Sequence, residues 1–392
     1  MRLKDEELIE FTRQLVQRPS LSGKEQDVAE YIKTKLEELG FEEVRTDDMG
    51  SVTGCIKGNK PGKTILLDGH MDTVSPLDTT KWAHHPYSGE IEDGKIFGRG
   101  TTDMKGSLAS MIFSIARFME KKKADFSGEI HIACTVYEEV FEGVACKQIV
   151  KEIKPDMVII GEATTSTIKI GQRGRAEIQV ETFGKTGHSS HPENGINAVL
   201  NMNKFINELK KLKLTNHEIL GEGILEITDI MSNPYPGDSM IPETCQITLD
   251  RRTLVGEKKK NVLKQVQDIV ERLRESDTQF DGKAYLVQGE GYCYTGKRFK
   301  SERFYPAWII DKEEKLVQAA ISGLERAGIQ TELSHFDFCT NGSYYCGKKK
   351  IPTIGYGPSK ENIAHTIDEY ITIEELTKSC KGFESILEEL TN

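Results

Sequence analysis

The stretches ILLDGHMDTV at residues 65–74 and GRGTTDMKG at residues 98–106 are the most direct guide to the fold. The apolar run Ile65–Leu67 breaks directly into polar residues, which is typical of a buried strand that delivers side chains at its C-terminal end. His70 and Asp72 are two residues apart, so on a continuing strand both point to one face. This spacing suits a metal-ligating imidazole whose second nitrogen is held by a carboxylate. The Gly-rich turn at 98–102 would place Asp103 at the entrance of a helix.

The composition narrows the class of protein. The 392 residues include 52 Lys and Arg against 62 Asp and Glu, which gives a formal net charge of −10. No basic stripe with interleaved aromatic residues occurs, so we expect no nucleic-acid partner. No apolar run approaches the ~18 residues of a membrane span, and the acidic N-terminus lacks the apolar core of a secretory signal. The eight cysteines show no CxxC spacing, so we expect buried, reduced thiols and a cytoplasmic location.

Helices and strands alternate in the first part of the chain. The apolar periodicity predicts helices at 5–17, 25–39, 103–120 and about 144–152, and a strand pair at 44–56. Further strands are predicted from residue 65, at 129–137 and at 157–160. This order predicts a layered α/β domain with a mostly parallel sheet, whose ligand crevice lies at the C-terminal ends of the strands.

The pattern changes near residue 173. Alternating strands at 175–183, 223–231, 244–253 and 283–288 enclose helices at 197–212 and 260–274, a β-α-β-β-α-β order typical of a ferredoxin-like α+β unit. Signals of the α/β type return after residue 304, with a helix at 313–327, a strand at 351–356 and a helix at 372–390. We therefore predict a discontinuous metal-binding domain of residues 1–174 and 290–392, interrupted by a lid or dimerisation domain of residues 175–289.

Candidate metal ligands follow several of the predicted strands. They are His70, Asp103, Glu138 or Glu139, Glu162 and His365. Two histidines and three carboxylates suit Zn²⁺ or a similar divalent ion. One shared carboxylate would give a dinuclear site with ions about 3.5–4 Å apart, and the remaining positive charge favours a bridging hydroxide.

Each of these residues has an alternative interpretation when taken alone. His70 is then more simply a core histidine, Asp103 a helix N-cap, and the pair Glu138 and Glu139 a polar strand end. The segment GRGTTDMKG could pass for a phosphate-binding loop, but it lacks the GxxxxGK[ST] pattern. The occurrence of all of them at successive strand ends favours a functional site.

The motifs DGHMDTV, GRGTTDMKG, Glu138-Glu139, GEA, GHSSHP and GPSKENIAH occur in this order along nearly the whole chain. Together they resemble the co-catalytic zinc amidohydrolases and metallopeptidases, such as acetylornithine deacetylase, succinyl-diaminopimelate desuccinylase, carboxypeptidase G and the aminoacylases. The segments GQRGR, LDRR, FYPAW and FCTNG further resemble a subgroup of selenium-metabolism-linked hydrolases.

The resemblance implies a role for each candidate. His70 and Glu162 would hold one metal ion, Glu139 and His365 the other, and Asp103 would bridge them. Glu138 resembles the general base, and Asp72 resembles the carboxylate that orients His70. The implied cofactor is two Zn²⁺ per chain, with Co²⁺ or Mn²⁺ as substitutes. A cis peptide bond after Asp103 is also implied.

Further residues are implied to contact the substrate. His188 on the inserted domain resembles a histidine that polarises the scissile carbonyl, and in dimeric members it reaches into the partner's site. Arg252 resembles an arginine that binds a substrate carboxylate, a task for which a planar, bidentate donor is suited. Thr340, Asn341 and Gly342 would contact the substrate backbone. Ser239 stands where the family commonly has Asn, which suggests an altered substrate position.

The resemblance predicts a hydrolase of a C–N amide bond in a small N-acyl amino acid or a dipeptide-like molecule with a free carboxylate. A water deprotonated by Glu138 would attack the carbonyl. The alternatives are an aminopeptidase, dipeptidase or carboxypeptidase of the same family, and more distantly a metal-binding protein without catalysis. A homodimer through the inserted domain is expected, with no nucleic-acid or membrane partner.

Overall fold

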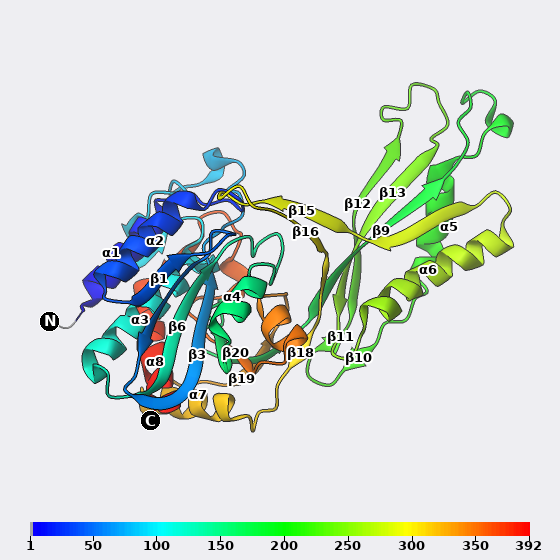
Figure 1. The fold of residues 1–392 in the computed structure, drawn as a ribbon. Coiled ribbons are helices and arrows are strands. Elements are labelled where there is room, and N and C mark those ends of the chain that lie inside the picture. Colours follow the sequence, from blue (N-terminus) through cyan, green and yellow to red (C-terminus); the bar gives the residue numbers. More distant parts are fainter. Residues whose placement is uncertain (1–2) are drawn as a thin grey trace.

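The computed structural model describes residues 3–392 and contains one large sheet and one smaller five-stranded sheet (Figure 1). The large sheet has nine strands with parallel neighbours at its centre, β6 (Ser127–Thr135), β3 (Lys60–His70), β7 (Met157–Ile160) and β20 (Thr353–Gly355). Its outer strands are β2 (Val52–Lys57) and β1 (Glu42–Thr46) on one side, and β8 (Ile168–Gln172), β18 (Trp308–Ile309) and β19 (Leu333–Phe336) on the other. The predicted α/β class with a mostly parallel sheet is confirmed.

Both faces of the large sheet are buried, because successive side chains of its central strands enter different cores. Ile65 and Leu67 of β3 belong to the main core, whereas Leu66 between them belongs to a smaller core on the other face. The helices that supply the main core are α1 (Asp5–Val16), α2 (Gln26–Glu38), α3 (Gly106–Lys122), α7 (Lys315–Arg326) and α8 (Ile373–Leu390). On the opposite face lies α4 (Cys146–Ile153), together with a helical turn at Ser343–Lys348. Apolar runs buried on both faces are what a parallel sheet requires.

The smaller sheet is antiparallel and is covered by helices on one face. Its order is β12 (Ile224–Asn233), β13 (Thr244–Thr253), β9 (Gly174–Phe183) and β14 (Asp281–Leu286), with β17 (Phe304–Tyr305) also paired to β9. Helices α5 (Ala198–Leu209) and α6 (Lys259–Ser276) supply its separate core. The chain order β9-α5-β12-β13-α6-β14 is the β-α-β-β-α-β order expected from the sequence, and Figure 1 shows this unit apart from the large sheet.

Short elements complete the fold. A three-stranded sheet contains β4 (Ile91–Glu92), β5 (Lys95–Phe97) and β21 (Tyr370–Thr372), and two hairpins are formed by β10 (Asn216–His217) with β11 (Gly221–Glu222) and by β15 (Gln288–Tyr292) with β16 (Arg298–Glu302). The hairpin of β15 and β16 was not predicted. Short helical turns lie at Thr79–Lys81, Pro192–Asn194 and Glu361–Ile363, and a kinked segment lies at Thr101–Lys105.

One predicted helix boundary is wrong. The helix expected at 103–120 begins at Gly106, because Asp103 and Met104 have non-helical backbone angles. The peptide bond between these two residues is cis, as the resemblance implied. Asp103 therefore lies in an irregular segment just before α3, with its carboxylate free to turn toward the ends of the strands.

In the part of the chain that the structure describes, no helix is long and apolar enough to cross a membrane. All eight cysteines are buried as free thiols. The thiols therefore match the expectation from the sequence.

Candidate metal centre

The candidate ligands meet at one edge of the large sheet. His70 is the last residue of β3, Glu138 and Glu139 follow β6, and Glu162 follows β7. The other two are Asp103 before α3 and His365 after β20. The strands β6, β3, β7 and β20 are parallel neighbours, so the segments after them emerge side by side. The topology thus brings together residues that lie up to 295 positions apart, since 365 − 70 = 295.

Asp103 lies between the two histidines. Its Oδ1 atom is 3.0 Å from Nε2 of His70, and its Oδ2 atom is 3.0 Å from Nε2 of His365. His365 Nε2 also lies 3.1 Å from Oε2 of Glu139. The two oxygens of one carboxylate therefore face different halves of the cluster, which is the arrangement expected of a bridging ligand.

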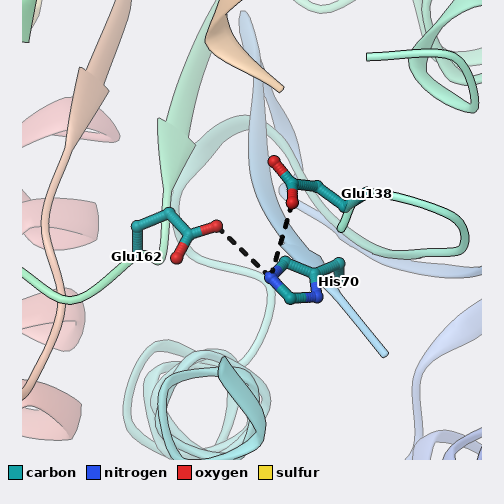
Figure 2. Close-up of side chains that lie close together, drawn as sticks. All are labelled: His70, Glu138 and Glu162. Carbon is teal, nitrogen blue, oxygen red and sulfur yellow. Dashed lines mark ion pairs between the residues drawn. The ribbon is translucent and has the colours of Figure 1, made fainter. Parts of the chain in front are cut away.

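Two further carboxylates complete the half around His70. Figure 2 shows Glu138 and Glu162 directed toward its Nε2 atom, at 3.8 Å from Oε2 of Glu138 and 3.4 Å from Oε1 of Glu162. One ligand atom from each of the three residues can be chosen so that all lie within 4.8 Å of one another. The same holds for His70, Asp103 and Glu139. Glu138 is therefore close enough to act either as a ligand or on a molecule beside the ligands.

The Asp72 carboxylate holds the loop that carries two of these glutamates. Its Oδ1 atom accepts the backbone N–H of Glu138 at 3.1 Å, and its Oδ2 atom accepts that of Glu139 at 3.2 Å. The Ser22 hydroxyl donates to the same Oδ2 atom at 2.6 Å. Asp72 is fully buried, so these bonds fix the backbone from which both glutamates extend.

Burial perturbs the carboxylates of the cluster. It raises the pKa of Glu138 well above its ordinary value; His70 opposes this shift, and the neighbouring carboxylates add to it. Burial and the charge of Asp103 raise the pKa of Glu139 to about 7, and burial also raises the pKa of Glu162. Burial is the main cause of these shifts, and repulsion between neighbouring carboxylates adds to it.

The histidines are perturbed in the opposite direction. Burial alone would lower the pKa of His70, but hydrogen bonds with Asp103 and Glu162 raise it well above its ordinary value. Hydrogen bonds with Asp103 and Glu139 raise the pKa of His365 to about 10. Burial alone would raise the pKa of Asp103, yet its bonds with both histidines hold it below its ordinary value. The carboxylates around the two imidazoles therefore favour a positive charge at this position.

This donor set fits divalent metal ions. The Oε1 atoms of Glu138 and Glu139 are buried and have no hydrogen-bond partner among the described residues. Unpaired buried carboxylate oxygens are costly unless a cation or a donor faces them. Imidazole nitrogens mixed with carboxylate oxygens suit zinc and similar ions. The structure therefore contains a candidate metal site of the kind expected from the sequence.

A cavity of about 310 Å³ adjoins the cluster. Its lining includes the ligand candidates Asp103, Glu138, Glu139, Glu162 and His365, together with Glu142, Ala163, Arg175, Arg252, Phe338, Cys339, Glu361 and Ala364. Arg252 forms an ion pair with Asp250, with Nε 2.8 Å from Oδ1, and its Nη2 atom donates to Oδ2 at 3.4 Å. Arg175 contacts Asp250, Glu177 and Glu142 at 2.7–3.0 Å. Of the predicted substrate-binding residues, Arg252 is thus the one placed in this cavity.

The segment at 340–342 lies inside the protein instead. The Thr340 hydroxyl donates to Oε1 of Gln172 at 2.6 Å. The Asn341 amide donates to Oδ2 of Asp68 at 2.8 Å and accepts the N–H of Gly143 at 2.8 Å. A side chain at Gly342 would meet the Trp308 ring at 2.6 Å. None of Thr340, Asn341 and Gly342 lines the cavity, and their substrate role stays a prediction.

His188 lies on the smaller unit and is exposed. Its Nδ1 atom accepts the Ser190 hydroxyl at 2.7 Å, and its backbone forms an isolated bridge with Met240. It does not line the cavity of its own chain. Ser239 is exposed as well and has a positive φ of 62°.

The sequence did not single out four residues near the site. Arg99 forms a buried ion pair with Glu369 at 2.5 Å, and Glu369 Oε1 accepts the backbone N–H groups of Gly100, Thr102 and Asp103 at 2.8–3.1 Å. The other two are Glu142 and Arg175 in the cavity wall. Arg99 and Arg175 stand inside motifs that were noted, GRGTTDMKG and GQRGR, where a charged residue next to glycine was the available signal. Glu369 and Glu142 stand in no sequence motif that indicated a functional role.

Comparisons with known proteins give one consistent result. The sequence model of the peptidase family M20/M25/M40 matches residues 66–389. The chain is 31% identical over 368 residues to the uncharacterized protein YgeY of Escherichia coli strain K12, covering 93% of this chain and 89% of the relative. It is 27% identical over 401 residues to the succinyl-diaminopimelate desuccinylase of Rickettsia bellii strain RML369-C, covering 97% and 96%.

Solved structures share the fold. The aminopeptidase PepT of Bacillus cereus superposes with a TM-score of 0.77 at 23% identity, over 99% of both chains. The YXEP protein of Bacillus subtilis, described as a dinuclear metal binding peptidase, superposes with a TM-score of 0.72 at 17% identity, over 97% of both chains. The resemblance to the selenium-linked subgroup stays a prediction.

Proposed function

The chain belongs to the peptidase family M20/M25/M40 and is a hydrolase of amide or peptide bonds, and we propose that it cleaves the C–N amide bond of a small N-acyl amino acid or dipeptide-like molecule. The observation that carries this proposal is the Asp103 carboxylate between His70 and His365, in a cluster of buried carboxylates beside a cavity. That cavity has the size of a small-molecule site.

Two zinc ions per chain are the proposed cofactor, with cobalt or manganese as substitutes. His70 and Glu162 would hold one ion, Glu139 and His365 the other, and Asp103 both. When bound, such ions polarise a carbonyl group and lower the pKa of water. The proposal is supported by the mixed histidine and carboxylate donor set and by the unpaired oxygen of Glu139.

Glu138 is the proposed general base. Its carboxylate lines the cavity and has one oxygen without a hydrogen-bond partner among the described residues, so it can accept a proton from water. Burial raises its pKa, which makes the proton easier to hold until it is delivered to the leaving amine. A base in this position typically contributes about 10²- to 10⁴-fold to the rate. Asp72 supports this role by fixing the backbone N–H of Glu138.

Arg252 is the proposed anchor for a substrate carboxylate. Its Nε and Nη2 atoms face Asp250, and the guanidinium also lines the cavity. A guanidinium held in this way is preorganised for a planar anion. The name of the desuccinylase relative favours a deacylase, which needs such an anchor and a pocket for the acyl group.

A peptidase that binds a free amine is the second candidate. The observation in its favour is Glu142, which lines the cavity and is buried, with Oε1 bonded to Arg175 and Oε2 unpaired in the described chain. An acidic group at this position could anchor a substrate amine. The name of the PepT neighbour agrees with this candidate.

A homodimer through the smaller unit is also proposed. The ten-residue strand β12 lies at the edge of its sheet and exposes Ile227, Ile230 and Met231. Unprotected apolar edge strands pair with other chains. His188 is exposed on the same unit, so a partner subunit could bring it to a carbonyl in the cavity. The cytoplasmic location also stays a prediction.

The test is a panel of N-acyl amino acids and dipeptides assayed with added Zn²⁺, Co²⁺ or Mn²⁺. We expect turnover of at least one panel member, with metal analysis approaching two ions per chain at saturation. Turnover of N-acyl amino acids alone supports the deacylase, and turnover of unblocked dipeptides alone supports the peptidase. A reproducible limit of zero ions would overturn the dinuclear site.

A further inference from the structure

The hairpin of β15 and β16, residues 288–302, is called the strap below. It is anchored in the smaller sheet, because β14 directly before it and β17 directly after it both pair with β9. Figure 1 shows the strap running from this sheet across to the large-sheet unit. At its tip the Tyr294 hydroxyl donates to the backbone oxygen of Gly50 at 2.8 Å, and the Thr295 hydroxyl donates to that of Asp48 at 2.6 Å. The strap therefore contacts both units.

Tyr292, the last residue of β15, forms two hydrogen bonds with Tyr137, the residue directly before Glu138. The Tyr137 hydroxyl donates to the backbone oxygen of Tyr292 at 2.8 Å and accepts the backbone N–H of Tyr292 at 3.0 Å. The Tyr137 hydroxyl thus acts as both donor and acceptor toward the same strap residue. The fit is close, since a side chain at Gly23 would meet this hydroxyl at 2.5 Å and the Tyr292 oxygen at 2.8 Å.

Aromatic packing reinforces these bonds. The Phe299 ring of β16 stands edge-on to both Tyr137 and Phe141, with centroid distances of 5.1 Å and interplanar angles of 88° and 80°. Arg303, just after the strap, donates to the backbone oxygen of Val140 at 3.1 Å, and its guanidinium lies 4.6 Å from the Phe141 ring centroid. The strap thus contacts the loop of residues 137–142 at Tyr137, before Glu138, and at Phe141, after Glu139.

The loop needs outside support. Tyr137 has a φ of 62°, which non-glycine residues adopt rarely and only where the surroundings enforce it. Its backbone N–H donates to Oε1 of the buried Glu25 at 3.3 Å, and the next two N–H groups donate to Asp72. The large-sheet unit therefore holds the backbone of the loop, and the strap holds its Tyr137 and Phe141 side chains.

We propose that the strap sets the position of the Glu138 carboxylate through Tyr137 and Phe299, which are positioning residues for hydrolysis. This inference rests on the proposed function, in which Glu138 is the base. Its physical reason is that a displacement of a reacting group by about 1 Å can lower a rate by about 10²-fold. Since the strap begins and ends in the smaller sheet, it also ties the base to the position of that sheet.

The first experiment measures amide hydrogen exchange in the zinc-loaded protein and does not depend on activity. Tyr137→Phe removes one hydroxyl from the strap contact at the loop, and Tyr294→Phe removes one from the strap contact at Gly50. We expect exchange of the Glu138 and Glu139 amides to become about tenfold faster in Tyr137→Phe and to stay within about twofold in Tyr294→Phe. Equal exchange in both variants and the wild type would overturn the inference.

The second experiment uses a panel substrate that the wild type hydrolyses. Tyr137→Phe should lower kcat by about tenfold with KM within about twofold and with two ions still bound, whereas Tyr294→Phe should keep the wild-type kcat. Equal kcat losses in the two variants at equal melting temperature would indicate a structural role only and overturn the inference. If the wild type hydrolyses nothing in the panel, the proposed function fails, while the exchange experiment still decides whether the strap holds the loop.

Phe299 provides an independent variant in case Tyr137→Phe does not fold. Phe299→Leu keeps an apolar side chain but removes both edge-on ring contacts, and Phe299→Tyr keeps the ring. We expect Phe299→Leu to speed exchange at Glu138 and Glu139 as Tyr137→Phe does, and Phe299→Tyr to restore wild-type exchange. Failure of Phe299→Leu to change exchange would contradict the proposed contact.

Discussion

The Nδ1 atom of His70 lies 2.8 Å from the backbone carbonyl oxygen of Asp72 and 3.6 Å from a carboxylate oxygen of the same residue. The carbonyl is therefore the closer partner that fixes the imidazole and leaves Nε2 to face the cluster. The Asp72 side chain instead accepts the N–H groups of Glu138 and Glu139. One residue thus orients a histidine through its backbone and two glutamates through its side chain.

This division of roles predicts the effect of Asp72→Asn. The new amide keeps one acceptor oxygen but turns a donor toward one of the two N–H groups, so the loop must shift. We expect kcat to fall by about 10- to 100-fold, with zinc content at saturation close to that of the wild type, because the carbonyl still holds His70. Steady-state kinetics measures kcat, and metal analysis measures the zinc content. Ser22→Ala, which removes one bond to the same carboxylate, is the control and should lower kcat by less than about threefold. Loss of zinc from Asp72→Asn would contradict the assignment.

The role of Glu138 can be separated from that of Glu139 by a pair of isosteric variants. Glu138→Gln removes the proposed base and should lower kcat by about 10²- to 10⁴-fold while two ions remain bound. Glu139→Gln should lose the ion held with His365, because its carboxylate lies 3.1 Å from that imidazole. Metal analysis and single-substrate kinetics of both variants show which glutamate binds metal and which one acts as the base. Equal loss of metal in the two variants would make Glu138 a ligand rather than the base.

The ligand candidates could be predicted because their signals are local. Each stands in a short polar segment near an apolar run or a Gly-rich turn, and parallel neighbouring strands bring such segments to one edge of the sheet. The details at Asp72 could not be predicted in this way. The spacing of two residues placed its carboxylate beside His70, but β3 ends at His70, so Asp72 leaves the strand geometry and turns its side chain to the next loop.

Other features depend on partners that sequence patterns do not reveal. Glu369 lies 270 residues after Arg99 and meets it only in the folded chain. The strap contains Gly289, Gly291 and Gly296, and glycines weaken a strand signal in the sequence. A Cβ atom added at Gly289 or Gly291 would lie only 2.2–2.3 Å from an aromatic ring, so these positions have no room for a side chain. Its contacts with Tyr137 are set by the fold around it.

The pair of Arg99 and Glu369 predicts a stability effect. Both side chains are almost fully buried, and the Glu369 carboxylate also accepts three backbone N–H groups around Asp103. Glu369→Ala leaves a buried guanidinium and three unpaired donors, so we expect the free energy of unfolding to fall by about 3–5 kcal/mol. Urea unfolding with zinc present measures this. Lys264→Ala breaks an exposed ion pair with Asp268 and should leave the same quantity close to its wild-type value. A loss of less than about 1 kcal/mol in Glu369→Ala would contradict the prediction.

The pH dependence of zinc binding follows from His365. Hydrogen bonds with Asp103 and Glu139 raise its pKa from 6.5 to about 10 in the metal-free protein, so at neutral pH it carries a proton that a metal must displace. The apparent zinc affinity should therefore rise between pH 6 and 9, by up to about tenfold per pH unit for each displaced proton.

The proton on His365 stabilises the metal-free fold fully below pH 6.5, and this contribution is lost as the pH rises through about 10. The increase in melting temperature on zinc addition should consequently grow with pH. Chelator competition and thermal unfolding at each pH measure both quantities, with His365→Gln expected to show a shallower slope. An affinity independent of pH from 6 to 9 would mean that no proton is displaced.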